Sequence, residues 1–114
     1  MLTIDGLKTF GANTEEGLQR CMGFEALYLK LVKTIPEEKH FGMLKDALAV
    51  HDLDAAFEAV HALKGVLGNL SLTPLYDLSV EMTEHLRVKD EANCQELLEK
   101  MFEKKAELEA LCAE

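Results

Sequence analysis

The stretch from Leu53 to Leu70 repeats apolar residues at the spacing of an α-helix, and it constrains the fold more than any other part of the chain. On a wheel of 3.6 residues per turn, six apolar residues lie within about 60° of Val60. A helix with one such face must bury it against other helices, so the pattern predicts an all-α bundle. The expected core face consists of Leu53, Ala56, Phe57, Val60, Leu63 and Leu67.

One histidine and two glycines lie beside this face. His61 is about 100° from Val60 on the wheel, at the border of the core, and Lys64 follows one turn later. Gly65 and Gly68 flank the histidine, although each glycine costs a helix interior about 1 kcal/mol relative to alanine. No turn residue indicates that the helix ends at either glycine. The pattern describes an imidazole between stretches of bare backbone, which suits a histidine that another macromolecule must reach.

The residue types at this border favour phosphoryl chemistry. Neutral imidazole, whose ordinary pKa is about 6.5, is a good nucleophile toward phosphorus. Lys64 can neutralise phosphoryl oxygens as a mobile point charge, and its stem can also cover the core edge. Only the neutral imidazole ring attacks phosphorus. We therefore expect transfer of a phosphoryl group to this ring to become slower as the pH falls below the pKa of the imidazole.

Residues 59–70, which read Ala-Val-His-Ala-Leu-Lys-Gly-Val-Leu-Gly-Asn-Leu, resemble the phosphoacceptor helix of histidine-containing phosphotransfer (HPt) domains. The family pattern is a histidine followed at three and four residues by lysine and glycine. The resemblance implies that His61 is the phosphoacceptor, that Lys64 stabilises the phosphate and that Gly65 permits close docking of a partner. For Gly68, partner docking and close packing between helices both stay open.

The motif covers about a dozen residues, and the expected order of helices extends the resemblance over most of the chain. Two residues depart from the family. Ser71 stands where many members have a small residue, often glycine, so a tight helix contact there is expected to be altered. His85 belongs to no family pattern.

The resemblance also implies the partners. HPt domains pass phosphoryl groups between aspartates of response-regulator receiver domains in a multistep phosphorelay, here those of a hybrid sensor histidine kinase and a downstream regulator. The receiver is expected to supply the divalent metal ion, so this chain itself is expected to bind no cofactor. No glycine-rich phosphate loop is present, so we expect a phosphocarrier that cannot phosphorylate itself from ATP, rather than an enzyme.

The helix pattern predicts one antiparallel, up-down four-helix bundle preceded by short N-terminal helices, as a single HPt-like domain over residues 1–114. The N-terminal helical segment covers about 1–33 and the bundle about 36–112. Capping chemistry sets most boundaries: Asn13 with Glu16, Thr34 with Glu37, Asp52, Thr73 before Pro74, and Asp90. The expected helices are Ile4–Phe10, segments within 14–33, Pro36–Val50, Leu53–Leu70, Pro74–Arg87 and Glu91–Leu111.

Composition excludes several classes of partner. The net charge of −9 and the lack of a basic cluster argue against nucleic acid and against an anionic membrane surface. Three widely spaced cysteines form no CxxC pair, which fits a reducing cytoplasm. No apolar run is long enough to span a membrane. The last helix carries an apolar stripe of barely two heptads, interrupted by Lys104, so we interpret it as core packing in a monomer rather than a dimer seam.

Two other functions are open to a bundle of this kind. The pairs Glu58 with His61 and Glu37 with His40 match the Glu-x-x-His spacing of di-metal carboxylate bundles, but Glu58 faces away from the expected core and Glu37 lies in a first turn. The second alternative is an adaptor or inhibitor that docks on a receiver or kinase without carrying phosphate. Such a protein has no use for a nucleophile, so the presence of both His61 and Lys64 favours transfer.

Overall fold

The computed structural model describes residues 1–113 of the chain, and the secondary structure of this part is helical. The predicted segment 14–33 is divided into two helices by a turn, and the predicted helix from Pro36 begins with a short 3₁₀ turn. The elements are α1 (Ile4–Phe10), α2 (Thr14–Arg20), α3 (Glu25–Val32), the 3₁₀ helix η1 (Ile35–Glu37), α4 (Lys39–Ala49), α5 (Leu53–Asn69), α6 (Thr73–Arg87) and α7 (Cys94–Cys112).

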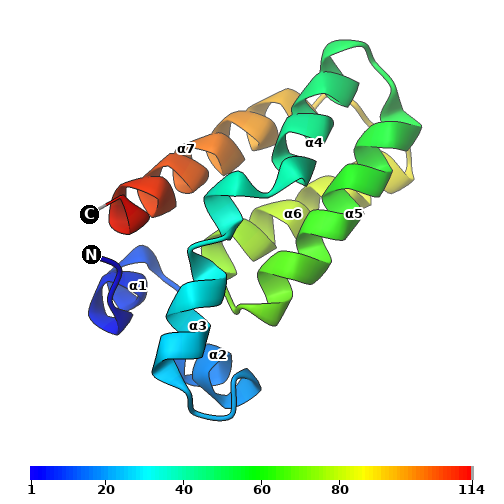
Figure 1. Cartoon of the computed structure of the whole chain (residues 1–114). Coiled ribbons are helices and arrows are strands. Elements are labelled where there is room, and N and C mark those ends of the chain that lie inside the picture. Colours follow the sequence, from blue (N-terminus) through cyan, green and yellow to red (C-terminus); the bar gives the residue numbers. More distant parts are fainter. Residues whose placement is uncertain (114) are drawn as a thin grey trace.

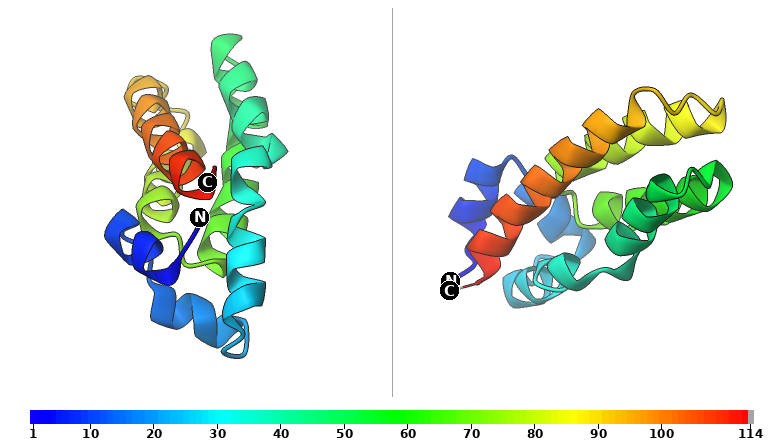
Figure 2. Two further views of the ribbon diagram at one scale, coloured as in Figure 1. Left: turned by 60° about the vertical axis from the view of Figure 1, so that its left-hand side comes forward. Right: turned by 90° about the horizontal axis from the view of Figure 1, so that it is seen from above.

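Helices α4 to α7 form the predicted up-down bundle (Figure 1). Three-residue connections join α4 to α5 and α5 to α6, and six residues join α6 to α7. Each helix packs against the next, and α4 also packs against α7, which closes the ring. The two further views show α1, α2 and α3 gathered at one end of the bundle, with α1 beside the end of α7 (Figure 2).

The core of the bundle contains most of the residues that the helix pattern assigned to it. On α5, Ala56, Val60, Leu63 and Leu67 are buried, whereas Leu53 and Phe57 are half-buried. The stripe on α7 also faces the chain's own core, because Leu97, Met101 and Leu108 are buried. This packing uses the apolar face of α7 within the bundle. Within residues 1–113, none of the helices could span a membrane.

Side chains cap two of the helices as predicted. The Asn13 carboxamide oxygen accepts the N–H of Glu16 at 3.1 Å, and the Asp52 carboxylate accepts the N–H of Ala55 at 3.1 Å. These caps fix the starts of α2 and α5, because each satisfies one of the amide groups that a first helical turn leaves free. The start of the helix that carries His61 was therefore predicted correctly.

Three other predicted caps are wrong. The Thr34 hydroxyl donates to the carbonyl of Leu31 at 2.6 Å, back toward α3, instead of capping the next helix. Thr73 is the first residue of α6, and the N-cap is Leu72. Asp90 lies in the turn before α7, where its carboxylate accepts the N–H of Ala92 at 3.2 Å, so α7 begins three residues later than predicted.

Four helices end on residues in the left-handed conformation that are not glycine. Met22, His51, Ser71 and Lys89 have φ angles between 53° and 58° and follow α2, α4, α5 and α6. At each one, the next residue donates its N–H to a carbonyl in the last turn, as Leu72 does to Leu67 at 3.1 Å. These ends carry no sequence signal, because the usual glycine is missing.

We expect Lys89→Gly to stabilise the protein relative to Lys89→Ala by about 1 kcal/mol, since glycine adopts φ = 58° without strain. Both substitutions remove the same exposed ion pair between Lys89 and Asp54, so that loss cancels in the comparison. Urea unfolding of the two variants measures the difference. Equal stabilities would show that the left-handed turn carries no strain.

The N-terminal helices hold the turn between α5 and α6. The fully buried Tyr28 of α3 donates its hydroxyl to the carbonyl of Leu70 at 2.8 Å, and burial raises the pKa of this hydroxyl to about 12. Asn13 donates its N–H to the carbonyl of Ser71 at 2.9 Å, and the Ser71 hydroxyl donates to the Glu16 carboxylate at 2.8 Å. These bonds fix the C-terminal end of the helix that carries His61.

Candidate functional site

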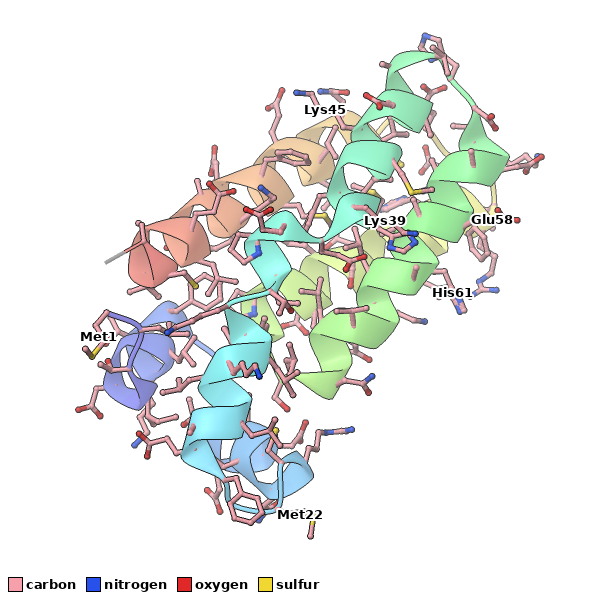
Figure 3. All side chains as sticks on the ribbon, viewed as in Figure 1. Met1, Met22, Lys39, Lys45, Glu58 and His61 are labelled. Carbon is pink, nitrogen blue, oxygen red and sulfur yellow. The ribbon has the colours of Figure 1, made fainter. Side chains whose placement is uncertain are left out.

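The imidazole of His61 projects from the third turn of α5, away from the bundle (Figure 3). Val60, the residue before it, is fully buried. His61 is rotated by one residue around the helix from Val60 and is exposed. The sequence placed this histidine at the border of the core, and the structure places it further out, in contact with solvent. Its side chain is therefore open to a second macromolecule.

The other histidines are engaged by carboxylates. His40 contacts Glu38, His51 contacts Glu91 at 2.5 Å, and His85 contacts Asp90 at 3.0 Å. The hydrogen bond from His85 is the main reason that the pKa of Asp90 lies below its usual value.

His61 differs from these three histidines. Within residues 1–113 its ring makes no hydrogen bond or ion pair. In this part of the chain it is therefore the histidine whose nitrogens no carboxylate occupies, and a reacting group can approach them freely.

Lys64 lies one turn after His61 on the same side of α5. Its side chain is half-buried, and its ammonium group has no acidic partner in the described part of the chain. Other lysines do have one: Lys89 pairs with Asp54 and Lys100 with Glu96. The cation beside His61 is thus not neutralised by a neighbour.

The two glycines of the motif have different surroundings. Gly65 is exposed, and a Cβ added there would meet no atom within 4 Å. A Cβ added at Gly68 would lie 3.0 Å from the Tyr76 ring of α6. Gly68 therefore lets the Tyr76 ring pack closely on α5, which is the packing alternative, while nothing inside the described chain requires a glycine at position 65.

Hollows lie on both sides of Gly65. A shallow one of about 390 Å³ is lined by Phe57, His61 and Gly65 among others. A second, of about 460 Å³, lies between α5, α6 and α2 and is bordered by Lys64 and Arg20. The surface around His61 can therefore accept side chains of a docked partner.

Ser71 is buried in the turn between α5 and α6, where it contacts the start of α2. It occupies the left-handed position after α5, where the backbone favours glycine, and its hydroxyl bonds to Glu16. The departure from the family pattern therefore lies at the turn after α5, and its effect on a helix contact stays a prediction.

Two residues near His61 were not predicted to be part of the site. The Phe57 ring lies 5.9 Å from the imidazole, centroid to centroid, and the Arg87 guanidinium lies 5.4 Å from the centroid of the Phe57 ring. Phe57 was assigned to the core, and four-residue spacing could have placed it beside His61. Arg87 carries no such signal, because only the register between α5 and α6 brings it to this face.

The predicted Glu-x-x-His pairs do not converge. Glu58 and His61 both project outward from α5 (Figure 3), and Glu37 is exposed at the end of η1. Within residues 1–113, no group of three or more His, Cys, Asp or Glu side chains could hold a metal ion. These side chains therefore give the di-metal alternative no support.

A comparison with models of protein families shows the family of this chain. A family model described as Hpt domain matches residues 37–114, a span that contains α4 to α7 and the whole His61 region. No curated protein and no solved structure matches the chain. Hpt domains are phosphocarriers that interact with receiver domains of two-component systems. Because the match covers about two thirds of the sequence, this chain belongs to the Hpt domain family and has a phosphotransfer role in phosphorelay signalling.

Proposed function

We propose that the chain carries a phosphoryl group on His61 between aspartates of receiver domains. In this proposal His61 is the phosphoacceptor, Lys64 stabilises the phosphoryl oxygens and Gly65 gives the receiver room to dock. One observation carries the proposal: of the histidines in the described chain, His61 is exposed, has no carboxylate partner and lies beside a cation that also has none. For Gly68, its contact with Tyr76 favours a packing role over docking.

The transfer step is an in-line displacement. A ring nitrogen of neutral His61 attacks the phosphorus of the aspartyl phosphate, and the N–P bond forms as the P–O bond to the aspartate breaks. The aspartate leaves as a carboxylate, and the proton on the other ring nitrogen stays in place. The reverse step returns the phosphoryl group to an aspartate of the next receiver.

This chain supplies only part of the transfer site. Lys64 offsets charge on the phosphoryl oxygens from one side, while the receiver would bring its aspartate and a divalent metal ion. A hybrid sensor histidine kinase and a downstream regulator are the proposed sources of the two receivers. A cytoplasmic location and a monomeric state belong to the same proposal.

The test is transfer from a receiver domain that carries labelled phosphate. Wild type should take up label that is stable to alkali and lost in acid, and His61→Gln should take up none. His51→Gln is the matched control. The side chain of His51 is 76% exposed, and this residue lies outside the His61–Gly65 motif. It should label like wild type, and thermal unfolding should show that all three proteins are folded.

Three other outcomes of these experiments would contradict the proposal. Label that persists in His61→Gln would place the acceptor elsewhere. Binding of the receiver without label on wild type would favour the adaptor alternative. Labelling of the isolated wild type by ATP and magnesium alone would overturn its assignment as a carrier.

A further inference from the structure

The imidazole of His61 has no polar partner that could fix its orientation. Within residues 1–113 its ring nitrogens make no hydrogen bond or ion pair, whereas each of the other three histidines contacts a carboxylate. In many histidine sites a hydrogen bond to one ring nitrogen orients the ring. Because this chain provides no such bond in its described part, the orientation of the imidazole must come from packing.

The half-buried Phe57 provides a packing contact for the imidazole. The centroids of the two rings lie 5.9 Å apart, and their planes are inclined at 42°. Phe57 precedes His61 by four residues, so the two side chains lie on the same side of α5. Side chains of an α-helix lean toward its N-terminus, which carries the imidazole toward the turn that contains Phe57. The exposed imidazole therefore rests on an aromatic ring that the bundle holds in part.

The other side of the imidazole is open. Gly65 follows His61 by four residues and has no side chain that could lean over the imidazole. A shallow hollow of about 390 Å³ is lined by Phe57, His61 and Gly65 among others. The imidazole is thus supported on the side of Phe57 and can be approached from the side of Gly65.

This support bears on the rate of transfer. A nucleophile reacts faster when it already has the orientation that the reaction needs. In an α-helix, a side chain such as that of His61 has two common χ1 rotamers, near 180° and −60°. Contact with Phe57 favours the rotamer that brings the two rings together. Less side-chain freedom then remains to be lost when a receiver docks.

We propose that Phe57 is a positioning residue for phosphoryl transfer, and that its ring holds the imidazole of His61 in one rotamer before a receiver docks. Phe57 touches no reacting atom in this proposal and acts through His61. The inference rests on the proposed role of His61 as phosphoacceptor. It predicts that the residue at position 57 affects the transfer step itself in addition to the stability of the fold.

The first measurement concerns the unphosphorylated protein. Wild type is compared with Phe57→Leu, which keeps an apolar side chain at the edge of the core, and with Phe57→Tyr, which keeps the ring. Three-bond NMR couplings to Cγ of His61 give the populations of its χ1 rotamers. We expect one dominant rotamer in wild type and in Phe57→Tyr, and a mixture of two rotamers in Phe57→Leu.

The second measurement is the rate of transfer from a receiver domain that carries labelled phosphate. At saturating receiver, the rate should fall about five-fold in Phe57→Leu, because the imidazole must then be ordered during the reaction. The receiver concentration that gives half of the maximal rate should change little. Phe57→Tyr should transfer at close to the wild-type rate.

Phe102→Leu is the matched control. Phe102 is also half-buried, lies 6.2 Å from the Phe41 ring and has the Lys45 ammonium 5.8 Å from its ring centroid, but it belongs to α7. This variant should lower the unfolding temperature, because a packed ring is lost. It should leave the χ1 populations of His61 and the transfer rate at their wild-type values.

Two results would overturn the inference. Unchanged χ1 populations in Phe57→Leu would show that the Phe57 ring does not hold the imidazole, and any slower transfer would then arise from another group, such as the Arg87 guanidinium that packs on Phe57. Mixed rotamers with wild-type transfer would show that the orientation does not limit the reaction. Failure of wild type to accept label from a receiver would instead overturn the proposed function, while the χ1 measurement, made without phosphate, would still report on the contact.

Discussion

Glutamine at position 65 should reduce phosphoryl transfer from a receiver at least ten-fold while making the folded protein more stable. Gly65 is exposed in the middle of α5, and a Cβ there would meet no atom within 4 Å. The bundle therefore has room for the new side chain, and removal of a helical glycine should add about 0.5–1 kcal/mol to the free energy of unfolding. If a receiver docks closely at Gly65, as we propose, it would not have that room, and a ten-fold loss of transfer would correspond to about 1.4 kcal/mol of docking free energy.

Gly42→Gln is the control for this prediction. Gly42 also lies within a helix, α4, is exposed, and has open space where a Cβ would stand. The control should gain similar stability and keep wild-type transfer, measured as the initial rate with the same labelled receiver. If Gly65→Gln transfers at the wild-type rate, no partner approaches closely at this position.

Alanine at position 17 should destabilise the protein by about 2 kcal/mol and lower its unfolding temperature by about 10 °C. The added Cβ would lie 2.5 Å from Cε1 and 2.6 Å from the hydroxyl oxygen of the fully buried Tyr28. The ring would have to move, and its hydrogen bond to the Leu70 carbonyl would be lost at a cost of about 1 kcal/mol. The higher helix propensity of alanine offsets part of this loss.

The clash is tested by relieving it. Leucine at position 28 lacks the outer ring atoms and the hydroxyl, so Gly17→Ala should cost much less in a Tyr28→Leu background than in wild type. Thermal and urea unfolding of the two single variants and the double variant give the coupling between the two sites. Additive losses would show that the Tyr28 ring is not what requires glycine at position 17.

The bundle could be predicted from the sequence because its helices carry periodic apolar faces and short connections. The apolar stripe on α5 contains Val60, Leu63 and Leu67, which are buried as expected. The caps at Asn13 and Asp52 were also predictable, because a side-chain oxygen and an amide three residues later meet within one turn.

Several helix boundaries could not be predicted in the same way. Ser71 and Lys89 end helices in the left-handed conformation without the glycine that usually marks such an end. The Thr34 hydroxyl bonds backward to α3 and the Asp90 carboxylate bonds within its own turn. For Thr34 and Asp90, a polar side chain has more than one possible backbone partner nearby, and the sequence does not show which one it takes.

The site was predictable where one helix provides it. His61, Lys64 and Gly65 follow from the motif, and their spacing puts all three on one side of α5. Contacts between helices could not be predicted from the sequence, because they depend on how one helix is positioned along the other. Tyr76 against Gly68 and Arg87 over Phe57 both require the pairing of α5 with α6, which no single-helix pattern contains.

Phosphorylation of His61 can be observed by recording the ¹H–¹⁵N NMR signals of the four histidine rings before and after phosphorylation by a receiver. We predict that the ring signals of His61 alone will show a nitrogen bonded to phosphorus. The rings of His40, His51 and His85 should stay unmodified. Phosphorylation of any of those three rings, or loss of phosphate from the receiver with all four rings unmodified throughout, would contradict it.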